Sequence, residues 1–174
     1  GDFFDVQIGD SALHCLPADF IAGKMMLVRA MILGLSLDLV QPTTQPMRDV
    51  YSSYDFAAMT PLQAHHSLGR IHQIKTLIIG GAPIYPELYD KLVSIHDNCY
   101  ETYGMTETIT HIAASKISFP KKPFRALDGI HLNVDGQGCL IVDAPDITDQ
   151  LIQTNDLVDM HNKKTFTYLG RRDN

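Results

Sequence analysis

The sequence predicts an α/β fold with a parallel-rich sheet flanked by helices, followed by a small β-rich lobe. Apolar, strand-like runs alternate with helix-like segments through the first part of the chain, which is typical of α/β domains. The run 75–79 (KTLII) is almost continuously apolar, as expected of a strand covered on both faces. Beyond residue 118 only short strand-like runs remain, separated by Gly, Asp and Pro. We therefore expect an α/β lobe at 1–117 and a β-rich lobe at 118–174.

The elements follow in order from these patterns. Gly34 suits the position just after a helix, and Thr60 followed by Pro61 is a typical helix start. The segment 118–123 (SFPKKP) is expected to be a linker. The expected strands cover 11–16, 37–40, 55–59, 75–79 and 98–102, then about 130–134, 139–143 and 164–169. The expected helices cover 20–33, 61 to about 71, and about 86 to 96.

Composition excludes several classes of function. A net charge of -6 argues against a nucleic acid partner, and the absence of an apolar run of 18 residues argues against a membrane span. The first ten residues are acidic and mixed, unlike a signal peptide. Cys15, Cys99 and Cys139 lack the spacing of a zinc site or a disulfide frame. We expect reduced, buried thiols and a cytoplasmic location.

Two predicted strand ends carry groups that suit a ligand, and ligands of open α/β sheets bind beyond the carboxyl ends of strands. The first is 77–83 (LIIGGAP), where Gly80 and Gly81 let the backbone approach a flat ligand closely. A tight turn between strand and helix is the alternative interpretation of these glycines.

The second strand end is 100–108 (YETYGMTET). Tyr103 offers a ring for stacking on a base, and Gly104 permits a sharp turn. Thr106 offers a hydroxyl to a phosphate oxygen, and Glu107 offers a carboxylate to Mg²⁺, which prefers oxygen ligands. Together they suit a nucleotide site, and the alternative is a polar turn with a hydrogen-bonded tyrosine.

Four segments together resemble the motifs of the acyl-adenylate-forming superfamily. They are GGAP at 80–83, YGMTET at 103–108, TNDL at 154–157 and YLGRRDN at 168–174. Their order and rough spacing along the chain match those of the superfamily motifs, and the resemblance covers essentially the whole chain. It implies an ATP-dependent ligase that activates a carboxylate as acyl-AMP and then transfers it to CoA.

The resemblance also implies roles for individual residues. Gly81 and Ala82 would line the adenine site, Asp156 would bind the ribose hydroxyls, and Asp173 would be the hinge of a C-terminal domain. Asn155 stands where the family has glycine, which is expected to weaken the local backbone geometry. The alternatives are a turn-capping Asp156 and a solvated basic turn at 171–172. The implied nucleotide-binding set is Gly80, Gly81, Ala82, Tyr103, Gly104, Thr106, Asp156 and Arg171, and the implied catalytic pair is Thr106 with Glu107, the latter holding Mg²⁺.

Two features of the superfamily have no counterpart in this sequence. One is the Ser/Thr/Gly-rich phosphate loop that ends in lysine, and the other is the C-terminal domain with its catalytic lysine. We expect the chain to be an internal fragment of the large N-terminal domain, inactive by itself.

The segment 16–34 predicts a helix that is apolar nearly all round, and it is therefore expected to be buried. Its only charged members from residue 20 onward are Lys24 and Arg29. A buried guanidinium needs an anion, and a carboxylate is the best match. The anion is either Asp19 or Asp38 within the protein, or a second carboxylate on the substrate.

The same segment resembles o-succinylbenzoate–CoA ligases of menaquinone biosynthesis, where an arginine at the position of Arg29 is associated with the distal carboxylate of the substrate. Ala22 stands where a serine is often found in those ligases, and Phe20 stands where a histidine is common across the wider family. Other acyl- or aryl-CoA ligases, peptide-synthetase adenylation modules and a non-catalytic nucleotide-binding domain remain alternatives. The expected acyl-pocket residues are Lys24, Arg29, Thr110 and His111.

Overall fold

The computed structural model describes residues 2–173, which form two compact units. The first unit runs to Glu101 and includes Lys116–Pro120. The second unit consists of Thr102–Ser115 and the chain from Lys121 onward. The sequence-based boundary after residue 117 stays a prediction.

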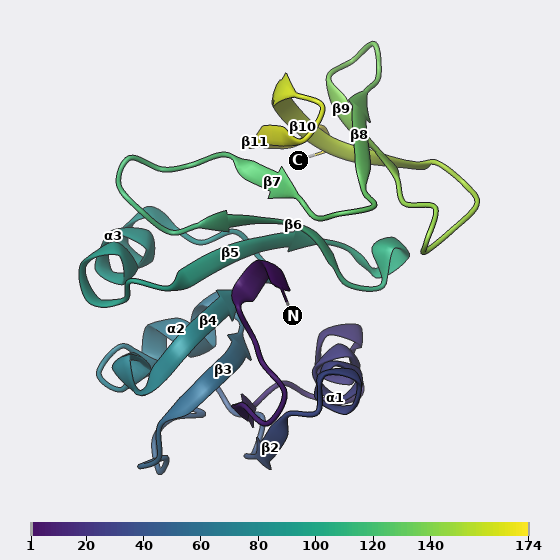
Figure 1. Cartoon of the computed structure of the whole chain (residues 1–174). Helices are drawn as coiled ribbons and strands as arrows, with labels where there is room; N and C mark the ends of the chain where they lie inside the picture. Colours follow the sequence, from purple (N-terminus) through teal and green to yellow (C-terminus); the bar gives the residue numbers. More distant parts are fainter. Residues whose placement is uncertain (1, 174) are drawn as a thin grey trace. The chain divides into compact units, whose positions relative to one another are not determined.

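A parallel sheet forms the centre of the first unit, with the strand order β2-β1-β3-β4-β5 (Figure 1). This confirms the predicted α/β class. Strand order reverses between β1 and β3, and ligands of open α/β sheets bind at the carboxyl ends of strands near such a point. The strands are β1 (Ser11–His14), β2 (Ser36–Leu39), β3 (Tyr54–Met59), β4 (Ile74–Ile79) and β5 (Cys99–Gly104), of which β5 continues into the second unit.

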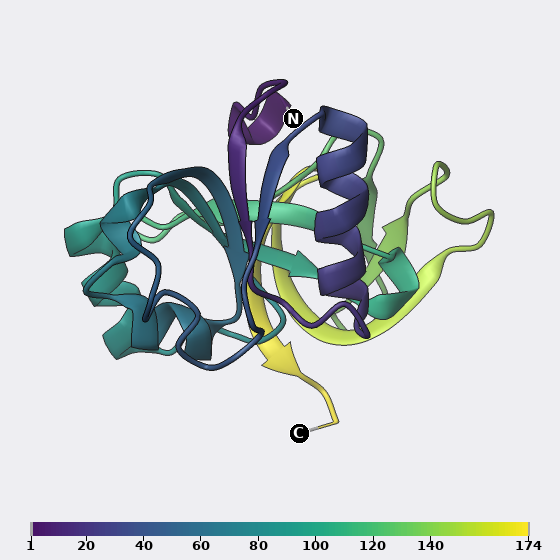
Figure 2. The ribbon, with the colours of Figure 1, turned by 90° about the horizontal axis from the view of Figure 1, so that it is seen from below.

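Helices cover both faces of this sheet, with α1 (Ile21–Leu33) on one face and α2 (Pro61–Ser67) and α3 (Pro86–Ile95) on the other (Figure 2). Gly34 ends α1 with a φ of 64° and donates its N–H to Ala30, as predicted. Thr60 begins α2, accepting the Gln63 N–H at 3.2 Å, while the Gln63 side chain accepts the Thr60 N–H at 3.1 Å. Short 3₁₀ turns occupy Asp2–Phe4 (η1) and Ile71–Gln73 (η2).

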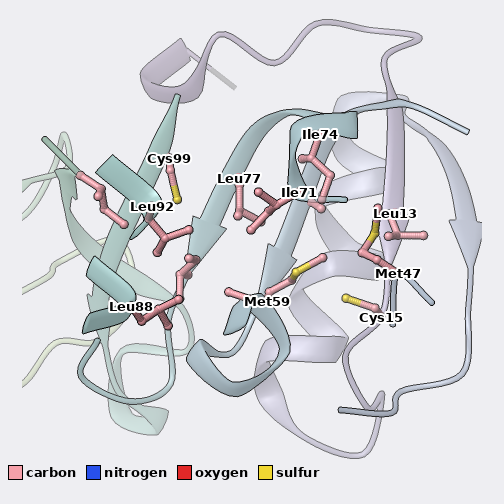
Figure 3. Packing of buried hydrophobic residues seen from close by; sticks show 14 of the residues in the cluster. Leu13, Cys15, Met47, Met59, Ile71, Ile74, Leu77, Leu88, Leu92 and Cys99 are labelled. Carbon is pink, nitrogen blue, oxygen red and sulfur yellow. The ribbon is translucent and has the colours of Figure 1, made fainter. Parts of the chain in front are cut away.

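The core of the first unit lies between the sheet and the pair α2 and α3 (Figure 3). Fully buried side chains from β1, β3, β4 and α3 meet there, among them Leu13, Met59, Leu77, Leu88 and Leu92. The cysteines are buried and free, as predicted. Burial raises the pKa of Cys15 and Cys99 to about 12, so both thiols stay protonated and act as apolar filling.

The prediction that the first helix is buried all round is wrong. Only Gly23, Met26 and Ala30 of α1 are buried, while Met31 and Ile32 are 75% and 76% exposed. A helix packed on one face of a sheet can bury a single stripe, and no described element covers its outer side. Gly23 belongs to the buried stripe, where a Cβ atom would lie 2.0 Å from the Pro17 carbonyl oxygen.

An antiparallel sheet forms the second unit, in the order β6-β7-β11-β10-β9-β8. Its core includes Phe124, Phe166, Leu140 and Val142. Within the described chain it contains no α-helix, in line with the predicted β-rich lobe. The strands are β6 (His111–Lys116), β7 (Phe124–Ala126), β8 (His131–Val134), β9 (Cys139–Asp143), β10 (Ile152–Asn162) and β11 (Thr165–Arg171), of which β6, β7 and β10 were not predicted.

Candidate functional site

The segment that resembles the superfamily signature forms a tight loop between β5 and β6 in the second unit. Gly104 lies against the far side of this loop. A Cβ atom on Gly104 would lie 2.5 Å from the Thr110 carbonyl oxygen and 2.6 Å from the His111 Cα atom. Glycine is needed here because two stretches of backbone touch, which differs from the sharp turn predicted.

The tip of the loop is a 3₁₀ turn, η3 (Thr106–Thr108). Thr106 and Glu107 are exposed, whereas Thr108 is fully buried. Within residues 2–173 no side-chain hydrogen bond or ion pair holds Thr106 or Glu107. The two predicted catalytic side chains are therefore presented to solvent, where a phosphate and its metal ion can reach them.

Backbone strain follows directly after this turn. Ile109 has a φ of 62° and a ψ of -43°, and the Thr110 N–H donates to the Thr108 carbonyl oxygen at 2.5 Å. This is a γ-turn centred on a β-branched residue, a rare conformation for such a side chain. Strain of this kind costs about 1–3 kcal/mol and gathers at functional sites. Sequence reasoning missed it, because nothing in the residue type signals it.

Tyr103 is held by both its ring and its hydroxyl. The hydroxyl donates to Asp156 Oδ2 at 2.5 Å. The ring packs edge-on against Phe166 at a centroid distance of 5.3 Å, and near Phe124 and Tyr168 at 6.0 and 6.2 Å. Burial, followed by the bond to Asp156, raises the pKa of Tyr103 far above its usual value. The structure thus brings together two residues predicted to bind the nucleotide.

Asp156 is buried on β10 with its backbone fixed by Thr154. The Thr154 hydroxyl accepts the Asp156 N–H at 3.1 Å and donates to the Leu140 carbonyl oxygen at 2.8 Å. The second carboxylate oxygen, Oδ1, lies 3.9 Å from Arg171 Nη1. Asp156 is therefore a β-strand residue in a polar network, and the turn-capping alternative does not describe it.

Asn155 does not weaken the local geometry in the way predicted. Among the described non-glycine residues only Asp5 and Ile109 have a positive φ, so this position makes no demand for glycine. The Asn155 side chain accepts from Arg172 at 3.1 Å and donates to Asp173 at 3.5 Å. It therefore links the TNDL segment to the end of the described chain.

Asp173, the predicted hinge residue, forms a two-pronged ion pair with Arg171. The Arg171 Nε and Nη2 atoms each lie 2.8 Å from an Asp173 oxygen. Both side chains are exposed. Hydrogen bonding to Arg171 lowers the pKa of Asp173 to about 2. This pairing holds Arg171 beside Asp156. The nucleotide contact predicted for Arg171 stays a prediction.

The GGAP segment lies in the first unit, directly after β4. The Gly80 N–H donates to the Met59 carbonyl oxygen at 3.1 Å, and Gly81 has a φ of 87°. Gly81 and Ala82 are exposed. The segment is thus open at the carboxyl edge of the sheet, as expected of a ligand-binding loop. That these residues share one cleft with Tyr103 and Asp156 stays a prediction.

Arg29 is half-buried on α1 and has no carboxylate partner among the described residues. Its Nη1 lies 3.1 Å from Met26 Sδ, and its guanidinium carbon lies 5.5 Å from the centre of the Phe56 ring. Burial lowers the pKa of Arg29. Of its two predicted partners, Asp38 accepts from the Tyr54 hydroxyl at 2.8 Å and Asp19 is exposed. The internal ion pair is therefore not formed.

The other predicted acyl-pocket residues are placed differently. Lys24 is exposed on α1 in the first unit. Thr110 and His111 are half-buried in the second unit, with Thr110 Oγ1 at 3.5 Å from His111 Nδ1. A pocket formed by all of them stays a prediction.

The described residues contain neither a preformed metal cluster nor a membrane-spanning helix. No group of three or more His, Cys, Asp and Glu side chains is arranged to hold a metal ion within 2–173. No helix in the same range is long and apolar enough to cross a membrane. The single exposed carboxylate of Glu107 suits Mg²⁺ that arrives on nucleotide phosphates, because that ion is usually held by one or two carboxylates and the phosphates themselves.

Comparison with known proteins gives a consistent result. Residues 2–147 match the model of a family described as AMP-binding enzyme. An acyl-CoA synthetase (AMP-forming)/AMP-acid ligase II-like protein from Dyadobacter fermentans is 35% identical, with a TM-score of 0.91 over 100% of this chain and 52% of its own. A 2-succinylbenzoate–CoA ligase from Enterococcus faecalis is 29% identical over 119 residues, or 62% of this chain and 24% of that protein.

The fold also matches o-succinylbenzoate coenzyme A synthetase from Bacillus subtilis, solved in complex with ATP and magnesium ion. That match has a TM-score of 0.82 at 20% identity and covers 98% of this chain and 43% of the other. At this identity the likeness concerns the fold alone. The chain spans about half the length of the solved structures it matches, and a quarter of the curated relative.

Proposed function

Because this chain belongs to the AMP-binding enzyme family, with its AMP-forming acid–CoA ligases, we propose that it forms the nucleotide-binding part of such a ligase, with o-succinylbenzoate as the acid. In the first step the carboxylate attacks the α-phosphate of ATP, giving acyl-AMP and pyrophosphate. In the second step the CoA thiolate displaces AMP and forms the thioester. Menaquinone biosynthesis is the setting that this substrate implies.

The nucleotide part of the proposal is supported by the loop that presents Thr106 and Glu107. The Thr106 hydroxyl donates to a phosphate oxygen, and Glu107 holds Mg²⁺, which offsets charge on the phosphates. Asp156 accepts from the ribose hydroxyls with Oδ1, because Oδ2 is engaged by Tyr103. Gly81 and Ala82 line the adenine, and an exposed glycine backbone allows its close approach.

The role assigned to Tyr103 goes beyond stacking on the base. Its ring already packs on Phe166, and its hydroxyl is bound to Asp156. We assign it a double task, with one face turned to the base and the hydroxyl fixing the ribose-binding carboxylate. Arg171, held by Asp173, lies 3.9 Å from the same carboxylate and places a positive charge beside it.

The observation that carries the substrate assignment is the unpaired guanidinium of Arg29. A charged group that is half-buried without an anion is costly, and a carboxylate on the substrate would compensate for it. o-Succinylbenzoate has two carboxylates, so one can be activated while the other binds Arg29. The relative from Enterococcus faecalis is named for the same acid, which supports the proposal.

Pyrophosphate exchange tests the proposal in a protein that joins this chain to the further segments found in its relatives. With ATP, Mg²⁺ and o-succinylbenzoate, exchange of labelled pyrophosphate into ATP is expected, and added CoA should give the thioester. The 174-residue chain alone should show no exchange, since it lacks a lysine-bearing phosphate loop. No exchange by the longer protein with any acid would overturn the assignment to ligases.

A second candidate is a ligase for a different carboxylic acid. It is favoured by the 35% identical relative from Dyadobacter fermentans, which is described only as an acyl-CoA synthetase. Exchange that proceeds with monocarboxylic aromatic or fatty acids, and not with o-succinylbenzoate, would select this candidate.

A further inference from the structure

Thr108 is the most deeply buried polar residue of the signature loop, and neither the sequence patterns nor the proposed function gives it a task. It is 0% exposed, although both residues before it are exposed. Its side chain points into the loop, where polar backbone groups from both sides of the turn converge. A buried hydroxyl in this setting needs both a donor and an acceptor.

The hydroxyl of Thr108 bridges the two sides of the loop. It accepts the Met105 N–H at 3.0 Å. Its single hydrogen can go to the Thr110 carbonyl oxygen at 2.8 Å or to the Met105 carbonyl oxygen at 3.0 Å. The shorter contact favours Thr110. In that arrangement one hydroxyl ties Met105, before the turn, to Thr110, two residues after it.

Two further contacts close the same loop. The Thr108 N–H donates to the Met105 carbonyl oxygen at 3.2 Å, and the Ile109 N–H donates to the Thr106 carbonyl oxygen at 3.0 Å. Gly104 touches the backbone at 110–111. The positive φ of Ile109 shows that the loop is held in a conformation this residue would not choose alone. The Thr108 hydroxyl bonds to backbone groups on both sides of this loop.

We propose that Thr108 is the positioning residue of the nucleotide site: its hydroxyl clamps the loop so that Thr106 and Glu107 face the phosphates and Mg²⁺. The inference rests on the proposed function for the ligands, and on the hydrogen bonds above for the clamp. Thr108 itself touches no reacting atom, because it is fully enclosed. Its effect on catalysis is carried by its two exposed neighbours.

Two substitutions separate the hydroxyl from the methyl group. Thr108→Val keeps the shape and removes the hydrogen bonds, whereas Thr108→Ser keeps the hydroxyl and removes a methyl. Thr76→Val is the matched control, because Thr76 is 3% exposed in the first unit and its hydroxyl accepts from Asn98 at 2.6 Å. The control removes a buried hydroxyl that lies outside the signature loop.

The first measurement is amide hydrogen exchange of the 174-residue chain, which needs no enzymatic activity. Thr108→Val should speed exchange at Met105 and Ile109 by at least about tenfold, because the loop loses its clamp. Thr108→Ser should leave both amides within about threefold of the unsubstituted chain, and Thr76→Val should leave them unchanged. Unchanged protection in Thr108→Val would overturn the clamp, whatever the function of the protein.

The second measurement is pyrophosphate exchange by the longer ligase, as a function of Mg²⁺ and ATP concentration. Thr108→Val should lower kcat at least about tenfold and raise the Mg²⁺ concentration at half-maximal rate, whereas Thr108→Ser should restore both. If Thr108→Val does not fold, Thr108→Ala is compared with Thr108→Ser in its place. Loss of rate equal to that of Thr76→Val, with the same Mg²⁺ dependence, would make Thr108 purely structural and overturn the proposal. An unsubstituted ligase without exchange would instead contradict the proposed function.

Discussion

The Tyr103 hydroxyl donates a hydrogen bond of 2.5 Å to Asp156 across a sequence separation of 53 residues. It joins the strand before the signature loop to the TNDL segment on β10. Because Asp156 is buried, removing this donor leaves a carboxylate oxygen with one partner fewer in a poorly solvated place. The bond is therefore expected to stabilise the second unit and to fix the geometry of the proposed nucleotide site.

Replacing Tyr103 with phenylalanine tests this bond. The ring contacts should survive, while the free energy of unfolding should fall by about 1.5–3 kcal/mol, as expected for a hydrogen bond to a charged group. Chemical denaturation of the 174-residue chain gives the value. Tyr51→Phe is the matched control, since Tyr51 is 75% exposed and should change stability little. Equal effects of the two substitutions would mean that the Tyr103–Asp156 bond adds no stability.

The alkaline limit of stability should follow from the same contact. Tyr103 has a pKa raised above its usual value by burial and by Asp156, so the unfolded chain loses this proton first. Stability from this group is complete below about pH 10 and is lost as the pH rises above it. Denaturation at pH 9 and pH 11 should show a smaller alkaline loss in Tyr103→Phe. A loss identical to that of the unsubstituted chain would contradict the raised pKa.

The fold was predictable because its signals are local. Alternation of apolar strands and helices identified the parallel sheet, and Gly34 and Thr60 marked helix ends where the structure has them. β10 was missed, because its sequence IQTNDLVDMHN lacks the regular apolar alternation of a half-buried strand. β10 takes its place in the sheet by pairing with β9 on one side and β11 on the other, and the residue pattern of β10 alone does not indicate this pairing.

The sequence motifs supplied the candidate site residues, whereas the contacts between them came only from the structure. The motifs identified Tyr103, Thr106, Glu107 and Asp156, yet no local pattern indicates that the first and last are hydrogen-bonded. The buried Thr108 and the strained Ile109 were also beyond reach, because burial and φ depend on the closure of the whole loop. The apolar composition of α1 likewise gave a wrong prediction of its burial, since composition does not reveal which side of a helix packs against another element.

The exposed side of α1 gives a stability prediction with an internal control. Met26 is fully buried and Met31 is 75% exposed on the same helix. Met26→Ala should lower the free energy of unfolding by about 2–5 kcal/mol, because it opens a cavity under the helix. Met31→Ala should change it by no more than about 0.5 kcal/mol, since alanine is a good helix former and little packing is lost. Thermal or urea denaturation decides, and similar losses would mean that the outer side of α1 is also packed.

His96 should make stability fall on mild acidification. Its Nε2–H donates to the Ile74 carbonyl oxygen at 2.6 Å and its Nδ1 accepts the Asn98 N–H at 3.2 Å, so the ring is neutral. Burial lowers the pKa of His96, and the unfolded chain therefore takes up the proton first. Stability from this group is complete well above pH 6.5 and is lost as the pH falls from there toward the lower folded pKa.

The measurement is the urea midpoint at pH 7.5 and pH 5.5. The drop between them should be smaller in His96→Gln, although buried His14, whose pKa is also lowered by burial, should keep part of it. The exposed His66, changed to glutamine, serves as the control and should leave the drop unaltered. An undiminished drop in His96→Gln would show that this ring is not the titrating group.

Substrate choice rests on Arg29, and its replacement with alanine is the decisive change. If the distal carboxylate of o-succinylbenzoate binds this guanidinium, Arg29→Ala in the longer ligase removes a charge-assisted hydrogen bond worth about 1.5–3 kcal/mol. The value of kcat/KM for that acid should then fall at least about tenfold, while KM for ATP changes little. The kcat/KM for a monocarboxylic aromatic acid should fall far less, because that acid has no distal carboxylate.

Arg29→Lys should recover only part of the loss, since an ammonium group cannot bind a carboxylate in two places. The exposed Arg48, changed to alanine, controls for the loss of one positive charge. Equal losses on both acids, with a lower melting temperature, would instead assign Arg29 to the packing of α1 on Phe56 and remove the main support for o-succinylbenzoate.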